Sequence, residues 1–236
     1  AMLTTYQSYL TGSLFGLILT LACCRSSDGS LSESAPVVVD NGPDAETFKV
    51  DVWADNWSAM YIEETRVMED SVAITTERSF NRESFSFTAT RPFQVNIIMK
   101  DFKENDSGLE YIGSQKQQMG DGGYIAQIKL AQSNDVVLVS NETWRCLTLH
   151  TAPLDKSCEE DPSPLESCEW EIIDEPSNWK ATDYDDSNWS YATVYSESTV
   201  SPKDGYDEVN WHASAQLIWG ADLESHNTVL CRVLLE

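Results

Sequence analysis

The sequence predicts an all-β protein, a β-sandwich or jelly roll, and three observations lead to this fold class. Helical periodicity is nearly absent after residue 25, and short runs of alternating apolar and polar residues take its place. Turn residues separate these runs at regular intervals. The chain also holds 8 Trp, 9 Tyr and 7 Phe, and 41% of its residues are hydrophobic, which excludes a disordered acidic chain despite a net charge of −24.

The expected strands begin after residue 46. Residues 47–53 alternate strictly between apolar and polar side chains, as a half-buried strand does. The other expected strands are the segments 59–62, 71–74, 84–89, 93–100, 124–129, 136–139, 213–219 and 228–235. We expect residues 47–236 to form one sandwich domain, in which the last strand pairs near residues 144–149, and the alternative is two small domains.

The first 24 residues carry no charged side chain. Their apolar run, residues 9–24, is shorter than the ~20 residues that span a membrane, and it is typical of the apolar region of a secretory signal peptide. Two alternatives stay open: acylation of Cys23 in a sequence similar to a bacterial lipobox, and a retained membrane anchor. Residues 25–46 are rich in Ser, Asp, Gly and Pro and are expected to form a flexible stalk.

Four cysteines follow the N-terminal segment, and an even number in an exported chain predicts two disulfides. Three connectivities are possible. Cys158 and Cys168 bracket a polar loop that a local disulfide would close. Cys146 and Cys231 each lie in an expected strand and would be bridged if those strands are adjacent. The paired spacing of a zinc site is absent from the sequence.

Composition also restricts the partners. With 15 Lys and Arg against 39 Asp and Glu, the chain lacks the basic clusters that bind nucleic acid or an anionic membrane surface. Contact with a membrane is therefore expected only through the N-terminal segment. N-glycosylation sequons begin at Asn56, Asn105, Asn141 and Asn188.

Two parts of the sequence resemble a known family. Residues 55–62 with Val67 are similar to the strand-and-turn unit of galactose-binding-like β-sandwiches, although Glu63-Glu64 replaces the usual Asn-Gly. Residues 179–192, together with segments 215–219 and 229–232, resemble the Trp, Asp-Asp-Ser and Cys-Arg pattern of the same extracellular modules. Residues 100–123 look like a block found in uncharacterised exported proteins of marine microbes. The resemblance implies a jelly-roll sandwich, and such modules bind sugars, mediate adhesion or act as spacers.

The longest loop is the expected ligand-binding region. Sugar recognition needs aromatic faces together with amides or carboxylates, and long loops on rigid β-scaffolds often carry binding sites. The candidate ligand-binding residues are Trp57, Asp106, Glu110, Tyr111, Gln117, Gln118 and Asp121. The alternative is a loop that only packs against the sandwich.

A structural Ca²⁺ is the one cofactor that the resemblance implies. The candidate ligands are Asp183, Asp185 and Asp186, and the alternative is that these acids form a solvated face. The sequence holds three histidines and lacks the common motifs of metalloproteases and serine hydrolases.

The sequence therefore predicts a non-catalytic, secreted or cell-surface module that binds glycans. The alternatives are a structural subunit of a surface assembly, formed with copies of itself or with another extracellular protein, and a carbohydrate-active enzyme.

Overall fold

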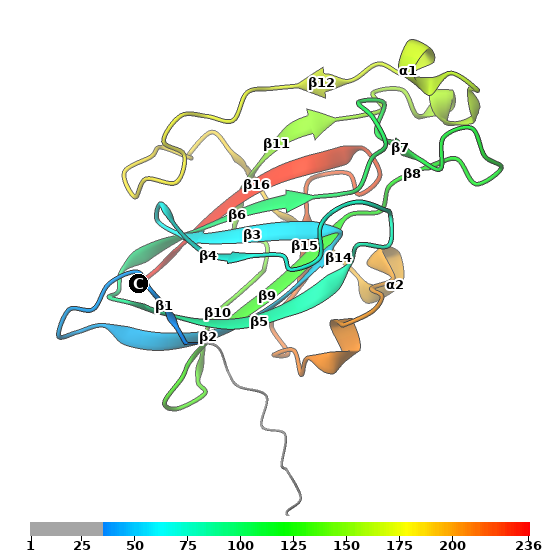
Figure 1. The fold of residues 1–236 in the computed structure, drawn as a ribbon. Helices are drawn as coiled ribbons and strands as arrows, with labels where there is room; N and C mark the ends of the chain where they lie inside the picture. Colours follow the sequence, from blue (N-terminus) through cyan, green and yellow to red (C-terminus); the bar gives the residue numbers. More distant parts are fainter. Residues whose placement is uncertain (1–34) are drawn as a thin grey trace, which may run out of the picture. The chain divides into compact units, whose positions relative to one another are not determined.

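The computed structural model describes residues 35–236, which form two packed β-sheets, a β-sandwich (Figure 1). The predictions for residues 1–24, and those for the first part of the stalk, lie outside the described residues. Within residues 35–236 no helix is long and apolar enough to cross a membrane.

The first sheet is antiparallel except at one edge, where β1 runs parallel to β5. Its strands, in spatial order, are β1 (Val37–Val38), β5 (Asn81–Ala89), β2 (Glu46–Asp55), β9 (Gly123–Leu130), β15 (Leu217–Trp219) and β14 (Thr193–Tyr195), with β10 (Val136–Val139) also paired to β9. Because β1 belongs to the sheet, regular structure begins inside the segment that we expected to be a stalk.

The second sheet is antiparallel throughout its described pairings. Its order is β12 (Glu171–Ile172), β11 (Arg145–Thr151), β16 (His226–Leu235), β6 (Phe93–Lys100), β3 (Trp57–Ile62) and β4 (Thr65–Glu69), with β13 (Ser190–Tyr191) on β11. The predicted pairing of the last strand is confirmed, since β16 lies beside β11 with Cys146 opposite Cys231.

The core lies between the two sheets. Inward-facing residues of β2, β3, β6 and β9 fill it, and a cluster of three rings, Phe48, Phe87 and Phe93, packs with centroids 5.1–5.6 Å apart. Both predicted disulfides are present: Cys146–Cys231 is buried in this core and Cys158–Cys168 closes a local loop. Trp53, Trp144 and Trp219 are also buried.

Two irregular segments cover parts of the outer faces. Residues 179–189 pack Trp179 and Trp189 against Leu230 of the second sheet. On the first sheet, α2 (Glu197–Val200) and the 3₁₀-helix η2 (Tyr206–Glu208) cover Trp53 and Leu217. These segments bury aromatic residues that lie between acidic residues in the sequence.

The strand predicted at residues 71–74 is wrong, because this segment is a loop. The backbone amide of Ser71 donates to the Glu83 carboxylate and that of Val72 donates to Asp70 Oδ1. These side-chain acceptors take the hydrogen bonds that a neighbouring strand would otherwise provide. The strand predicted at 213–219 is shortened to β15, since a turn from His212 to Ala215 precedes it.

Candidate functional site

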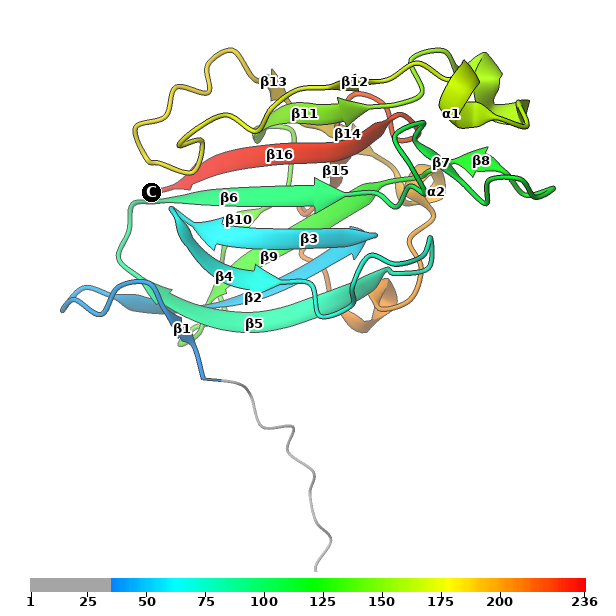
Figure 2. The same ribbon diagram turned by 45° about the horizontal axis from the view of Figure 1, so that its top comes forward.

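The candidate site lies at one end of the sandwich, where β2 and β6 finish and β9 and β16 begin. Asp55, the last residue of β2, is paired with Gly123, the first residue of β9. Asp101 follows β6, and its amide donates to the carbonyl of Asn227 near the start of β16. The short strands β7 (Leu109–Glu110) and β8 (Gln118–Met119), the 3₁₀-helix η1 (Lys156–Glu160) and α1 (Pro164–Ser167) project from this end, away from the C-terminus (Figures 1 and 2).

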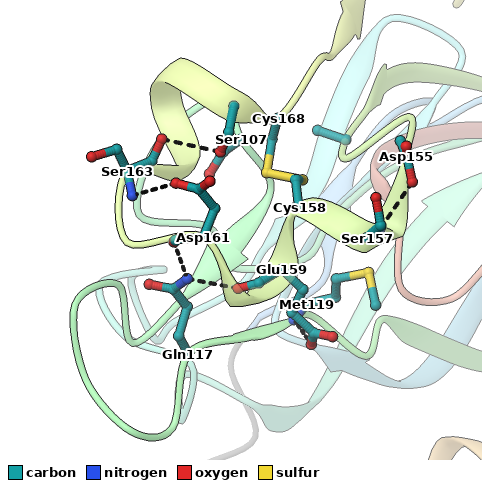
Figure 3. The surroundings of a disulfide bond; sticks show 12 residues. Ser107, Gln117, Met119, Asp155, Ser157, Cys158, Glu159, Asp161, Ser163 and Cys168 are labelled. Carbon is teal, nitrogen blue, oxygen red and sulfur yellow. Dashed lines mark hydrogen bonds between the residues drawn. A yellow bond between two sulfur atoms is a disulfide. The ribbon is translucent and has the colours of Figure 1, made fainter.

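The Cys158–Cys168 disulfide fixes the segment that lies beside the long loop (Figure 3). The Gln117 side-chain amide donates to the carbonyls of Glu159 and Asp161, at 2.6 and 2.8 Å. The Glu159 carboxylate in turn accepts from the Met119 amide. The disulfide-closed segment therefore holds β8 in place from one side.

A surface pocket of about 550 Å³ opens between β8 and the loop at residues 221–224. Its polar lining consists of Gln118, Asp121, Lys156, Glu159, Tyr195, Thr199, Asp222 and Glu224. Lys156 Nζ is held at 2.8 Å by Asp222 and at 2.7 Å by Glu224, so this cation is fixed on one wall. The pocket thus presents donors and acceptors at defined positions.

Four carboxyl groups gather beside this pocket, and we call Asp55, Asp101, Glu110 and Asp121 the carboxyl cluster. Asp55, Asp101 and Glu110 are 0–3% exposed, whereas Asp121 is partly exposed and lines the pocket. Lys203 Nζ lies 2.9 Å from Asp121 and 3.4 Å from Asp55.

Burial controls the protonation of the cluster. Desolvation, followed by repulsion from Asp121, raises the pKa of Asp55 to about 7 despite the nearby Lys203. The same two causes raise the pKa of Glu110 to about 8. The pKa of Asp101 lies well above its ordinary value, because this carboxyl is fully desolvated and is repelled by the other three.

Gly120 allows the buried carboxyl to lie beside the pocket wall. A Cβ atom on Gly120 would lie 1.7 Å from Asp101 Oδ2, so any larger residue there would require the Asp101 carboxyl to move. The glycine therefore lets the backbone that lines the pocket pass directly over the Asp101 carboxyl.

The structure brings three of the predicted ligand-binding residues to this end. Gln118 and Asp121 line the pocket. Glu110 is buried behind it and accepts a hydrogen bond from the Gln118 amide at 3.3 Å.

The other four predicted ligand-binding residues contact different partners. The Gln117 amide is bonded to the disulfide segment as described, and Asp106 pairs with Lys103 at 2.6 Å. The Tyr111 hydroxyl is hydrogen-bonded to Glu77, which raises its pKa to about 12. Trp57 does not line the pocket, and Lys100 Nζ lies 4.9 Å from its ring centroid.

The three aspartates predicted to bind Ca²⁺ have separate environments. Asp186 forms an ion pair with the buried Arg232, Asp185 accepts the Ser187 amide, and Asp183 is exposed. Among residues 35–236, no group of three or more His, Cys, Asp or Glu side chains has an arrangement that could hold a metal ion. Calcium binding by these aspartates stays a prediction.

The sequons also differ in exposure. Asn188 is exposed, and Asn105 and Asn141 are partly buried. Asn56 is 1% exposed, its amide donates to Asp55 and to the Glu77 carbonyl, and its oxygen accepts the Phe102 amide. The folded protein therefore leaves no room for a glycan on Asn56.

Several residues of this site were not predicted from the sequence, namely Asp55, Asp101, Lys156, Lys203, Asp222, Glu224 and Asn227. Asp55 and Asp101 had a recognisable signal, since each is an acidic residue just beyond a predicted strand. Lys203 and Asp222 lie in irregular segments, and only the tertiary structure brings them to the site.

Fold and site together define a disulfide-bonded β-sandwich protein with a polar pocket and a buried carboxyl cluster at one end. The two disulfides indicate an oxidising, extracellular-type environment. Comparison with protein families, with curated proteins and with solved structures finds no match. The function is therefore argued from the residues of this chain.

Proposed function

We propose that this chain is a non-catalytic, extracellular module of the galactose-binding-like type that binds a glycan in the pocket beside β8. The observation that carries the proposal is the lining of that pocket, which combines amide, carboxylate, ammonium and hydroxyl groups over about 550 Å³. Pockets of this size accommodate small ligands and a few sugar rings. Secretion through residues 1–24 is part of the proposal.

The polar groups suit sugar hydroxyls, each of which both donates and accepts hydrogen bonds. Gln118 and Glu224 are exposed and Asp121 is partly exposed, so the polar atoms of all three are accessible to a ligand. Tyr195 also lines the pocket and is fixed by the bond from its hydroxyl to the Gly220 carbonyl, 2.8 Å long. Its ring supplies the one aromatic surface among the lining residues.

A glycan array followed by calorimetry of the full chain tests this proposal. We expect binding to at least one glycan, and Glu224→Ala should weaken it about tenfold, as expected for loss of a charge-assisted hydrogen bond worth about 1.5 kcal/mol. Glu166→Ala is the matched control, because Glu166 is also exposed and does not line the pocket. Absence of binding to any glycan would refute the proposal, and turnover of a bound glycan would refute its non-catalytic part.

A second candidate function is a subunit of a surface assembly, and one observation favours it. Strand β12 lies at the edge of the second sheet, and large apolar side chains around it are exposed: Leu154, Leu165, Trp170, Ile172 and Ile173. Exposed apolar sheet edges favour association with another chain.

Light scattering on the purified protein separates the two functions. An assembly built through β12 should elute well above the monomer mass, and Ile172→Lys should return it to a monomer. A monodisperse monomer at all concentrations tested would exclude the assembly and leave the glycan-binding proposal intact.

A further inference from the structure

The pocket beside β8 carries an excess of negative charge. Its lining residues include four acids, Asp121, Glu159, Asp222 and Glu224, and a single base, Lys156. Four negative charges against one positive charge give the lining a net charge of −3. A cleft lined by one sign of charge concentrates ions of the opposite sign. The pocket therefore attracts cations and repels anions.

The one cation of the lining already has partners within the protein. Lys156 Nζ lies 2.8 Å from Asp222 and 2.7 Å from Glu224. A carboxylate or sulfate of a ligand at Lys156 would meet these two carboxylates, and like charges so close together repel each other. Lys203, beside the lining, is likewise paired with Asp121 at 2.9 Å. Anionic glycans are therefore disfavoured in this pocket.

Three carboxylates of the lining are accessible to a ligand. The side chains of Glu224 and Asp121 are 52% and 44% exposed, and Glu159 is partly exposed. An ammonium group donates up to three hydrogen bonds, and its bonds to carboxylates are about twice as strong as those between neutral groups. A positively charged ligand thus gains more in this pocket than a neutral one.

A buried group behind the pocket wall favours the same ligand charge. Asp101 is 3% exposed, and neither of its carboxyl oxygens has a hydrogen-bond partner. The backbone of Gly120, which lines the pocket, passes over Asp101 Oδ2. An unpaired buried carboxyl costs free energy, and a positive charge on the other side of this backbone lowers that cost.

We propose that the pocket selects glycans that carry free amino groups, as oligosaccharides of glucosamine do, over neutral, N-acetylated and anionic glycans. The inference rests on the proposed function, since it assigns the ligand class of the same pocket. The protonated amine pairs with the accessible carboxylates of Asp121, Glu159 and Glu224, and the sugar hydroxyls bond to Gln118 and Thr199. N-acetylation removes the positive charge, and a uronate replaces it with a negative one.

Calorimetric titration of the full chain with four tetrasaccharides tests this selectivity. They are built from glucosamine, glucose, N-acetylglucosamine and galacturonate, and the titrations are made at about pH 6, where amines are protonated. In about 20 mM NaCl the glucosamine tetramer should bind about tenfold more tightly than the glucose tetramer, which has hydroxyls in place of the amines. In about 500 mM NaCl this ratio should fall to about threefold or less, because salt screens exposed charges. The galacturonate tetramer should not bind.

Two substitutions in the lining should change the selectivity in opposite directions. Glu224→Gln keeps a hydrogen-bonding side chain but removes its charge, so it should weaken binding of the glucosamine tetramer about fivefold and that of the glucose tetramer less than about twofold. Lys156→Met makes the lining more negative and should strengthen binding of the glucosamine tetramer about fivefold. Glu166→Gln, an exposed acid outside the pocket, is the matched control and should bind as the wild type does. The side chains of Lys156 and Glu224 are 42% and 52% exposed, and circular dichroism checks the fold of each variant.

Several results would overturn the inference. They are a glucosamine tetramer that binds no more tightly than the glucose tetramer, a preference that salt does not reduce, and the same loss in Glu166→Gln as in Glu224→Gln. Equally tight binding of trilysine would show that the pocket recognises ammonium groups without recognising a sugar. If the glucosamine tetramer does not bind but other glycans of the array do, this inference fails and the proposed function stands. If no glycan binds, both fail.

Discussion

Among single residues, the buried carboxyls dominate the electrostatics of the protein. Burial raises the pKa of Asp55 to about 7 and that of Glu110 to about 8 in the folded state, from ordinary values of 3.8 and 4.5. At a pH between the ordinary and the raised pKa values, these two carboxyls hold more protons in the folded state than in the unfolded state. The free energy of unfolding therefore falls as the pH rises from about 4 to about 8, and the cost of these groups is fully present above that window.

Asp101 provides the sharpest test of this pH dependence. Asn is nearly isosteric with a protonated Asp, so in chelator-containing buffer Asp101→Asn should leave stability almost unchanged at pH 4. At pH 8.5, where the raised pKa of Asp101 costs the wild type stability, the variant should be more stable by about 1–3 kcal/mol. Urea unfolding across this pH range measures the difference, with Asp174→Asn as the control. A variant that is equally destabilised at every pH would contradict the argument.

A stabilising Asp101→Asn would also show that the wild-type residue is unfavourable for folding alone. Residues of that kind are commonly retained for a ligand.

Among the secondary-structure elements, the segment over the second sheet is hydrogen-bonded to one buried cation as well as packed through Trp179 and Trp189. Arg232 of β16 is 1% exposed and donates to the carbonyls of Ala181 and Tyr184, to Asn96 Oδ1 and to Asp186 Oδ2. These bonds join β6, β16 and residues 181–186. The Cys-Arg pattern that resembles extracellular modules thus has a structural role here.

Replacement of Arg232 should detach this segment. Arg232→Met removes the cation and leaves Asp186 and two carbonyls without their partner, so we expect a loss of about 3–5 kcal/mol in the free energy of unfolding. Arg66→Met is the control, since Arg66 pairs with Glu69 on the surface and should cost less than about 1 kcal/mol. Equal losses of unfolding free energy for the two variants, measured by urea unfolding, would show that Arg232 does not hold residues 181–186 against the second sheet.

The sequence located the longer strands, but it did not show which short segments join a sheet and which form loops. Alternation located β2 and β5, because a half-buried strand must alternate. The segment 71–74 was also predicted as a strand but forms a loop, since the Glu83 and Asp70 carboxylates accept the hydrogen bonds of its first two amides. Strands of two or three residues, such as β12 and β14, are too short to leave a periodic signal.

For the molecule as a whole, the site depends on topology that no local pattern contains. Asp55 ends β2, Asp101 follows β6 and Asn227 lies near the start of β16, and hydrogen bonds between these strand ends bring together residues that are far apart in sequence. The sequence located the long loop, with Gln118 and Asp121. Lys156 and Glu224 could not be predicted, because nothing in residues 152–170 or 220–225 indicates that they meet.

Net charge is a further property of the whole molecule. The chain carries −24 charges, and like charges repel more strongly in the compact state than in the unfolded chain. Raising NaCl from about 10 to about 500 mM shortens the Debye length from about 30 Å to less than 8 Å, so the melting temperature should rise by a few degrees. Differential scanning calorimetry in chelator-containing buffer measures this shift, and a melting temperature that falls with salt would contradict it.

The position of the C-terminus has a practical consequence for all of these measurements. Glu236 follows β16 at the end of the sandwich away from η1, α1 and β8 (Figure 2). A biotin or an affinity tag attached after Glu236 would orient the protein on a sensor surface with its pocket facing the solution. Immobilised in that way, the protein can be presented to large polysaccharides without the support obstructing access.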